Sequence, residues 1–314
     1  MKIHTDSGDF KNITNPVVTV GTFDGIHRGH LSVISRLTEI ATVLNGESVV
    51  ITFSPHPRQV LLGDNSYKVL CTFSEKKDLL GKAGVDHLVV LPFTVEFAAL
   101  SFGDFVRQVL VDKLHAKAMV IGYDHHFGNK REGNFDKLKP LAAKYGVELY
   151  QVLPEEVEKT AVSSTNIRKA LLSVKMKEAN AWLGYEYSLE GKVITGNMIG
   201  RKLDYHTANI QPDDDAKLIP ARGVYAVTIV HEGFEYRGML NIGIRPTIND
   251  KEETIEVHIL DFNKEIYGHD LKVVFHEYVR EEKRFDHLEA LKAQLDDDKI
   301  AVIKIFEERR VLKP

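Results

Sequence analysis

The sequence has only one cysteine among its 314 residues. A single thiol cannot form an internal disulfide, and it excludes a zinc site built from several cysteines. Cys71 lies in the apolar stretch KVLCTF, where we expect it to be a small buried side chain. Hydrophobic residues make up 43% of the chain, which is long enough for two separate cores.

A surplus of positive charge is also missing. Lys and Arg number 41 against 45 Asp and Glu, which gives a net charge of −4 and disfavours a nucleic-acid partner. No uninterrupted apolar stretch approaches the roughly 18 residues of a membrane span, and the opening MKIHTDSGDFKN has no apolar signal-peptide core. We therefore expect a cytoplasmic protein without a membrane partner, present as a monomer or a weak homo-oligomer.

The first half of the chain alternates short apolar runs with amphipathic segments of helix length. The runs are VVTVG, SVVITF, HLVVLPF, AMVIG and VELYQVL, between residues 17 and 153. This alternation predicts a parallel sheet covered by helices on both faces. Capping-box patterns predict helix starts at Thr72 and Ser101. The helix after the first run should bury the stripe Leu31, Ile34, Leu37, Ala41 and Leu44.

The second half has a different pattern. The runs GKVITG, GVYAVTIV, EYRGMLNIG, TIEVHILDF and LKVVFHEYV follow one another without helix-length gaps, and HEG at 231–233 resembles a hairpin turn. This pattern predicts a small antiparallel β-barrel. A helix from about Asp286 should cover it through Leu288, Leu291, Leu295, Ile300, Ile303 and Phe306. The change of pattern predicts two domains, residues 1–184 and 185–314.

The string VGTFDGIHRGH, residues 20–30, leads from the first run into a helix. Unpaired backbone N–H groups and the positive end of the helix dipole favour an anion there. Imidazoles of His27 and His30 could donate hydrogen bonds to phosphate oxygens as a phosphoanhydride breaks, which is the chemistry of nucleotidyl transfer. Alternatively, the two histidines could be a solvated loop residue and a helix cap.

GTFDGIHRGH resembles the signature of the nucleotidyltransferase superfamily, which shares its HxGH element with class I aminoacyl-tRNA synthetases. The superfamily's second element is present as SSTNIR at 163–168, where it implies binding of the β- and γ-phosphates. The resemblance implies a catalytic role for His27 and His30. It implies ATP binding by Gly21, Phe23, Asp24, Gly25, Gly29, Ser163, Ser164, Thr165 and Arg168.

Two further stretches, FSPHP at 53–57 and IGYDHHFGNKREGN at 121–134, follow predicted strands. Together they resemble the FMN adenylyltransferase module of bacterial bifunctional riboflavin kinase/FAD synthetases, with His125 and His126 departing from the family pattern. The implied fold of this half is a Rossmann-like nucleotidyltransferase domain. The implied residues on the flavin side are His56, Pro57, Asp124, Phe127 and Gly128.

GKVITGNMIGRKLDYHTANI at 191–210 resembles the riboflavin kinase signature, with His206 and Asp204 where the family has proline and glycine. A hydroxyl and an amide oxygen are hard ligands suited to Mg²⁺, and the resemblance implies that Thr207 and Asn209 hold Mg²⁺ with ATP. The implied ATP-binding residues of the kinase are Gly196, Gly200, Arg201, Thr207 and Asn209.

Alternation in TIEVHILDF places Ile255, Val257 and Ile259 on one face and Glu256 with His258 on the other. A strand glutamate on such a face often only meets solvent. The resemblance instead implies that Glu256 is the general base for the riboflavin 5′-hydroxyl, with Asn241, Arg245 and Thr247 in the flavin pocket. The motifs NIGIRPT, EVHILDF and REEKRFD occur in the family's order.

The resemblance thus implies a bifunctional enzyme that makes FMN from riboflavin and FAD from FMN, using ATP and Mg²⁺. Two alternatives stay open from the residues. The second half could be a flavin-sensing module whose kinase site has decayed, because His206 replaces the family proline. The HxGH element could also belong to a tRNA-handling protein, although the chain is short and acidic.

Overall fold

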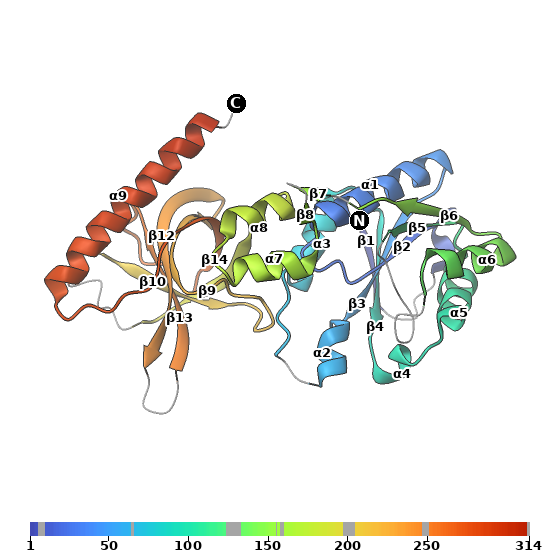
Figure 1. Cartoon of the computed structure of the whole chain (residues 1–314), viewed down its shortest axis with the longest axis horizontal. Helices are drawn as coiled ribbons and strands as arrows, with labels where there is room; N and C mark the ends of the chain where they lie inside the picture. The colour runs from blue at the N-terminus through green and yellow to red at the C-terminus, as the bar shows by residue number, and fades with distance from the viewer. Residues whose placement is uncertain are drawn as a thin grey trace. The chain divides into compact units, whose positions relative to one another are not determined.

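The structure is a computed structural model that describes residues 1–5, 10–63, 66–123, 133–154, 156–157, 160–196, 205–246 and 251–312. The chain divides into two compact units, Met1–Ser164 and Thr165–Pro314. Figure 1 labels the helices and strands of both units. Each unit has its own sheet and its own buried cores.

The first unit contains the predicted parallel sheet. Its strands, in the order β1-β4-β3-β2-β5-β6, all pair in parallel. They are β1 (Lys2–Thr5), β2 (Val17–Val20), β3 (Ser48–Ser54), β4 (His87–Pro92), β5 (Ala118–Gly122) and β6 (Glu148–Val152). The first edge strand, β1, was not predicted from the sequence, because four mostly exposed residues carry no apolar run. The sheet order reverses at β2, which lies between β3 and β5.

Helices cover both faces of this sheet. Helices α1 (Arg28–Val43) and α3 (Phe73–Lys82) pack on one face through Ile34, Leu37 and Leu80. The other face is covered by α5 (Phe102–Phe105), the π-helical segment η2 (Val106–Lys113) and α6 (Phe135–Tyr145). The predicted helix caps Thr72 and Ser101 are confirmed. Short elements complete the unit: η1 (Phe10–Asn12), α2 (Pro57–Leu62), α4 (Val95–Ala98), β7 (Glu156–Val157) and β8 (Thr160–Ala161).

The second unit contains the predicted antiparallel barrel. It is closed, with strand order β10-β13-β12-β11-β14-β9. The strands are β9 (Ser188–Ile194), β10 (Thr207–Pro212), β11 (Gly223–His231), β12 (Phe234–Pro246), β13 (Lys251–Ile259) and β14 (Asp270–Arg280). Helices α7 (Ser164–Leu171) and α8 (Met176–Leu183) precede it. The predicted hairpin turn is confirmed, because Glu232 and Gly233 join β11 to β12 with φ angles of 51° and 80°.

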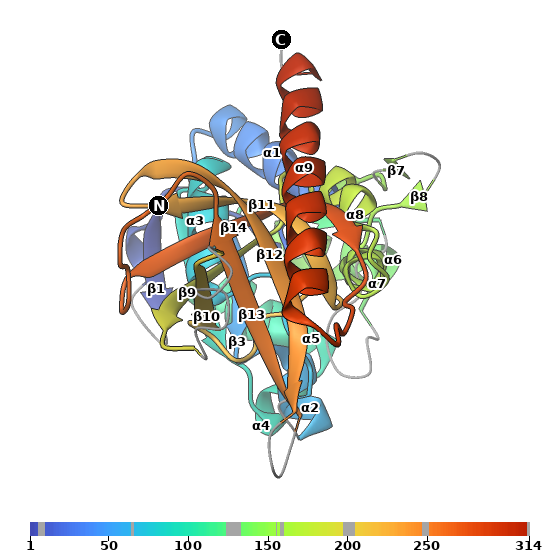
Figure 2. The ribbon, with the colours of Figure 1, turned by 90° about the vertical axis from the view of Figure 1, so that its left-hand side faces the viewer.

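The predicted C-terminal helix is α9 (Leu288–Leu312), which contacts β11, β12 and β14. Figure 2 looks onto the barrel with α9 crossing in front of its strands. Val302 is fully buried there against Ala226 and Met239. The predicted apolar stripe is wrong at Leu288 and Ile300, which are 46% and 66% exposed. Leu288 is the first residue of the helix, and Ile300 lies between the buried residues Asp298 and Val302 but is itself exposed, so apolar spacing alone overestimates the buried face.

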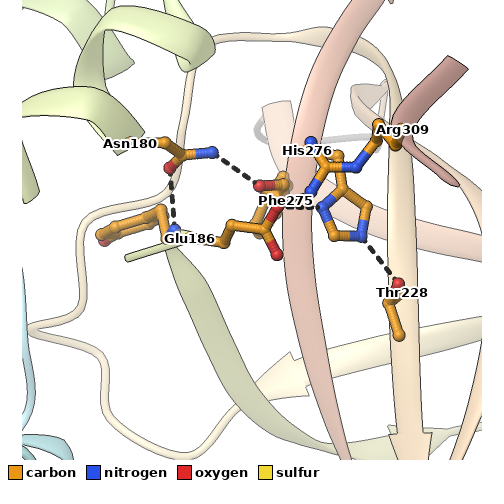
Figure 3. Close-up of polar contacts among 7 residues, drawn as sticks. Asn180, Glu186, Thr228, Phe275, His276 and Arg309 are labelled. Carbon is orange, nitrogen blue, oxygen red and sulfur yellow. Dashed lines mark hydrogen bonds and ion pairs between the residues drawn. The ribbon is translucent and has the colours of Figure 1, made fainter. Parts of the chain in front are cut away.

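Polar contacts join α8, α9 and the barrel (Figure 3). The carboxylate of Glu186 accepts hydrogen bonds from the guanidinium of Arg309, on α9, and from Nδ1 of His276, 2.8 Å away on β14. The other ring nitrogen of His276 lies 2.7 Å from the Thr228 hydroxyl. Because His276 is only 5% exposed, both of its nitrogens need these partners.

Candidate active sites

The first candidate site is the loop that joins β2 to α1, at the carboxyl end of the sheet where the strand order reverses. Ligands of open α/β sheets bind at this position. Gly21, Phe23, Asp24, Gly25 and Gly29 all belong to this loop or to the first turn of α1. Gly25 has a φ of 85°, in the left-handed region that glycine adopts without strain. The loop therefore brings backbone N–H groups and the start of α1 together.

His27 and His30 lie against each other at the start of α1. Their rings stack with centroids 3.7 Å apart and an interplanar angle of 14°. Nδ1 of His27 accepts the backbone N–H of His30 at 3.3 Å, so His27 is the N-cap of the helix. A neutral His27 with Nδ1 as acceptor carries its proton on Nε2, which makes Nε2 a donor. The alternative of a solvated loop residue is wrong for His27, which is 6% exposed and is itself the helix cap, and its cap role is compatible with a donor suited to an anion.

Asp24 and Ser164 connect this loop to the second motif. Asp24 is 2% exposed, and its Oδ1 accepts the backbone N–H groups of Leu70 and Cys71 at 2.7 and 3.3 Å. The Ser164 hydroxyl donates to the Asp24 carbonyl at 2.8 Å. The two sequence motifs, 140 residues apart, are therefore in direct contact. The Asp24 side chain therefore fixes the loop to residues 70–71.

Two residues near this loop carry interactions that sequence reasoning missed. Nζ of Lys76 is 2.7 Å from the Thr22 carbonyl and 3.4 Å from the Thr52 hydroxyl, and Lys76 is only 7% exposed. Lys76 lies in the first turn of α3, and no role was predicted for it from the sequence. The prediction that Cys71 is buried is confirmed, and its Sγ accepts the Gly25 N–H at 3.0 Å.

The remaining predicted residues of this site are only partly placed. His56 is the N-cap of α2, with Pro57 as the first helical residue, and its ring stacks on Tyr67 at 4.6 Å. Thr165 and Arg168 lie on α7, in the second unit. Several predicted positions lie outside the described residues: Asp124, Phe127 and Gly128, together with His125 and His126.

The second candidate site is on the barrel. A pocket of about 300 Å³ is lined by Gly196, Thr207 and Asn209, three of the predicted residues. The segment from Phe262 to Tyr267, between β13 and β14, forms another part of its wall. Gly196 packs directly on Asn209, since an added Cβ would lie 2.0 Å from Asn209 Nδ2. The pocket wall thus contains a glycine without a side chain, the hydroxyl of Thr207 and the amide oxygen of Asn209.

Three predicted residues share one row across neighbouring strands. Glu256 on β13 pairs with Asn209 on β10 and with Asn241 on β12. Directly opposed residues of antiparallel strands point to the same face, with Cβ atoms about 4.5–5.5 Å apart. The predicted alternation is confirmed, because Ile255, Val257 and Ile259 are buried. Glu256 therefore lies between two carboxamides.

The unusual His206 has a defined partner. Nδ1 of His258 lies 2.8 Å from the His206 carbonyl, and a carbonyl can only accept, so Nδ1 carries the proton. Burial lowers the pKa of His258, which favours the neutral ring in this arrangement. His258 also pairs with Thr207 across the strands. The backbone before Thr207 is therefore held by a side chain.

Other predicted residues of the second site are not described. Gly200, Arg201 and Thr247 lie outside the described residues, and so does Asp204. Arg245 belongs to β12, and its side chain is outside the description.

Two family models match the chain in succession. The model for FAD synthetase matches residues 9–166, and the model for riboflavin kinase matches residues 183–306. The first match contains the loop with His27 and His30, and the second contains the row with Glu256.

Curated relatives resemble the chain over nearly its whole length. Proteins named bifunctional riboflavin kinase/FMN adenylyltransferase are 36% identical in Buchnera aphidicola, covering 98% of both chains, and 39% identical in Listeria monocytogenes, covering 90% of both. The protein of that name in Escherichia coli K12 is 33% identical over 92% of both chains.

A solved structure titled as a macrolide-efflux protein from Streptococcus pneumoniae is 32% identical to the chain, with a TM-score of 0.88. It covers 96% of this chain and 99% of its own. Among the residues that the structure describes, no helix is long and apolar enough to cross a membrane.

Proposed function

The chain belongs to the family of bifunctional riboflavin kinase/FMN adenylyltransferases, and we propose that its two candidate sites carry one reaction each. The enzyme phosphorylates riboflavin to FMN and adenylylates FMN to FAD, using ATP in both steps. The observation that supports the division is the order of the two family matches, residues 9–166 for FAD synthetase and then residues 183–306 for riboflavin kinase.

In the adenylyltransferase reaction, a phosphate oxygen of FMN attacks the α-phosphorus of ATP and pyrophosphate leaves. Charge grows on the phosphate oxygens, where Nε2–H of His27 and the ring of His30 can donate hydrogen bonds. The start of α1 adds backbone N–H groups and the positive end of its dipole. Lys76 stabilises the loop by donating a hydrogen bond to the Thr22 carbonyl. Neither histidine becomes covalently linked.

In the kinase reaction, the riboflavin 5′-hydroxyl attacks the γ-phosphorus of ATP and ADP leaves. Glu256 accepts the hydroxyl proton, and Asn209 and Asn241 on both sides orient its carboxylate. Mg²⁺ fits this donor set, because the Thr207 hydroxyl and the Asn209 amide oxygen are the hard oxygen ligands it prefers. When bound, Mg²⁺ would neutralise charge on the ATP phosphates.

The contact between His258 and His206 supports a working kinase site over a decayed one. Proline in the family restricts the backbone before the Thr-Ala-Asn element, whereas here the His258 ring holds the His206 carbonyl. The direct test is turnover of riboflavin with ATP and Mg²⁺ by the purified chain. We expect FMN and ADP first, then FAD and pyrophosphate. Absence of FMN from a folded chain that still converts FMN to FAD would favour the flavin-sensing alternative.

Gly196→Ala is expected to lower FMN formation by about 10- to 100-fold, the loss typical of disturbed support around a metal site. The added Cβ would meet Asn209, which is only 8% exposed and has little room to move. Initial rates of both half-reactions measure the effect, and FAD formation from supplied FMN should not change. Gly81→Ala is the matched control, because an added Cβ there meets nothing within 4 Å. Equal kinase rates in the two variants would contradict the assignment of Asn209.

We propose that the kinase domain begins near residue 185 but is stabilised by α8. Asn180 on α8 donates to the Phe275 carbonyl at 2.9 Å and accepts the Tyr187 N–H at 2.8 Å (Figure 3). Residues 165–314 and 185–314 should both phosphorylate riboflavin. The shorter chain should unfold at a lower denaturant concentration. Its free energy of unfolding should be lower by about 1–3 kcal/mol for each buried group left without its partner.

Asn180→Ala in the full chain separates the contribution of these hydrogen bonds from that of the rest of α8. It should reproduce part of the loss measured for the shorter chain. Equal stability of the two shorter chains, measured by urea unfolding, would mean that α8 is dispensable.

We further propose that the enzyme acts in the cytoplasm, where ATP is available, as a monomer or a weak homo-oligomer without a nucleic-acid partner. The net charge of −4 supports the last point. Light scattering at increasing protein concentration tests the oligomeric state.

A further inference from the structure

Two histidines and a glutamate meet on the barrel, outside the row that contains Glu256. His231 ends β11, Glu232 is the first residue of the hairpin turn, and His269 precedes β14. An imidazole nitrogen of each histidine and a carboxylate oxygen of Glu232 lie within 4.8 Å of one another. This side-chain cluster, His231–Glu232–His269, has no role in the two reactions above.

The spacing of these atoms matches that of metal ligands. His231 Nε2 lies 3.0 Å from His269 Nδ1, and His269 Nδ1 lies 3.8 Å from Glu232 Oε1. Two ligand atoms on a tetrahedral zinc ion, with bonds of about 2.0–2.1 Å, are about 3.3 Å apart. These two distances lie on either side of this value, and His231 and Glu232 offer ligand atoms within 4.8 Å of each other. Ligand geometry therefore requires side-chain movement, for which the exposed Glu232 and His269 side chains have room.

The two histidines are held in place by the fold. His231 is 5% exposed, and its ring packs edge-on against Phe262 with centroids 6.1 Å apart. Two hydrogen bonds fix the backbone of His269: its carbonyl accepts the Val193 N–H at 2.9 Å, and its own N–H donates to the Ile266 carbonyl at 3.1 Å. Glu232 and the His269 side chain are reached by solvent, which provides an entry path for an ion.

We propose that His231, Glu232 and His269 form a binding site for one divalent transition-metal ion of the zinc type. Two imidazoles and one carboxylate are a set that zinc uses, with water in the remaining position. Imidazole nitrogen favours such ions over Mg²⁺, which prefers oxygen ligands. Binding displaces to solvent the proton that the two imidazole nitrogens share, since each must offer a lone pair.

The site would tie two parts of the barrel together. His269 is two residues after the segment from Phe262 to Tyr267 that forms part of the pocket wall, and His231 contacts Phe262. An ion held by both histidines would fasten this segment to the β11–β12 turn. Its ordering should appear as slower amide hydrogen exchange in residues 262–270.

Calorimetric titration of the full chain with Zn²⁺ tests the proposal, with excess Mg²⁺ present to occupy oxygen sites. Co²⁺ in parallel gives a visible absorption spectrum that reports the ligands. We expect one ion per chain in the wild type. His231→Ala and His269→Ala should each weaken binding by about 100-fold or more, because loss of even an outer-shell partner costs 10- to 100-fold. Glu232→Gln should weaken it less.

His269→Ala is the decisive variant, because its side chain is 44% exposed and its loss should not affect folding. His287→Ala, an exposed histidine of the same unit, is the matched control and should bind as the wild type does. A wild-type chain that takes up neither Zn²⁺ nor Co²⁺ would overturn the proposal. Binding that is unchanged in both His269→Ala and Glu232→Gln would overturn it as well.

Discussion

A chain carrying both His27→Ala and His30→Ala is expected to make FMN from riboflavin but no detectable FAD. The stacked imidazoles lie at the start of α1, where phosphate charge would develop, and they belong to the first unit. Removing one preorganised donor of this kind typically costs roughly 10²- to 10³-fold in kcat. Chromatographic separation of riboflavin, FMN and FAD over time measures both half-reactions in one sample.

The controls must separate chemistry from helix capping. Loss of the His27 cap alone should cost about 1 kcal/mol of stability. His27→Asn retains a side-chain acceptor for the helix start but not the imidazole donor, so it should fold well and still lose FAD formation. His115→Asn, at an exposed position with a φ of 51° that asparagine tolerates, should be silent. Loss of FMN formation in a folded double variant would contradict the assignment of separate sites.

Glu256→Gln is expected to lower kcat for FMN formation by roughly 10² to 10⁴, the contribution of a positioned general base. Glutamine has nearly the same size and can still meet Asn209 and Asn241, but it cannot take the hydroxyl proton. The affinity for ATP should change little, because the pocket residues Gly196 and Thr207 remain. Steady-state kinetics with riboflavin, and separately with FMN supplied directly, measure the two reactions.

Glu253→Gln is the matched control for Glu256, since it lies on the same strand and is exposed. Its ion pair with Arg222, at 3.9 Å, is a surface contact of small energetic value. A Glu256→Gln rate within about a factor of two of the wild type would correspond to well under 1 kcal/mol. That result would contradict the proposed role of Glu256 as the general base.

Much of the fold could be predicted because buried strands carry their own pattern. Val17–Val20 and Ser48–Ser54 are continuous apolar or β-branched runs, as expected where both faces of a sheet are covered. Strands β1 and β10 were missed for the opposite reason. Lys2–Thr5 is an exposed edge strand, and Thr207–Pro212 was read only as part of a binding motif. Neither contains a buried run that periodicity could detect.

The candidate sites could be predicted only in part. The resemblance to family signatures predicted catalytic roles for His27, His30 and Glu256, which stay predictions, but it contains no information on strand register. The row of Asn209, Glu256 and Asn241 arises from pairing between residues up to 47 positions apart. Lys76 was missed because a lysine in the first turn of a helix usually faces water, whereas here tertiary packing buries it under the Thr22 carbonyl.

Cys71 is the single thiol of the chain, and its reaction with an alkylating reagent can report on movement of the loop at the first site. Its Sγ lies behind the first site, between the Gly25 N–H and the Phe23 carbonyl, and the residue is 4% exposed. An alkylating reagent can reach it only when the loop separates from the 70–71 segment. The labelling rate therefore measures how often the loop opens, without any engineered cysteine, and its slowing by a nucleotide would measure how much the nucleotide closes the loop.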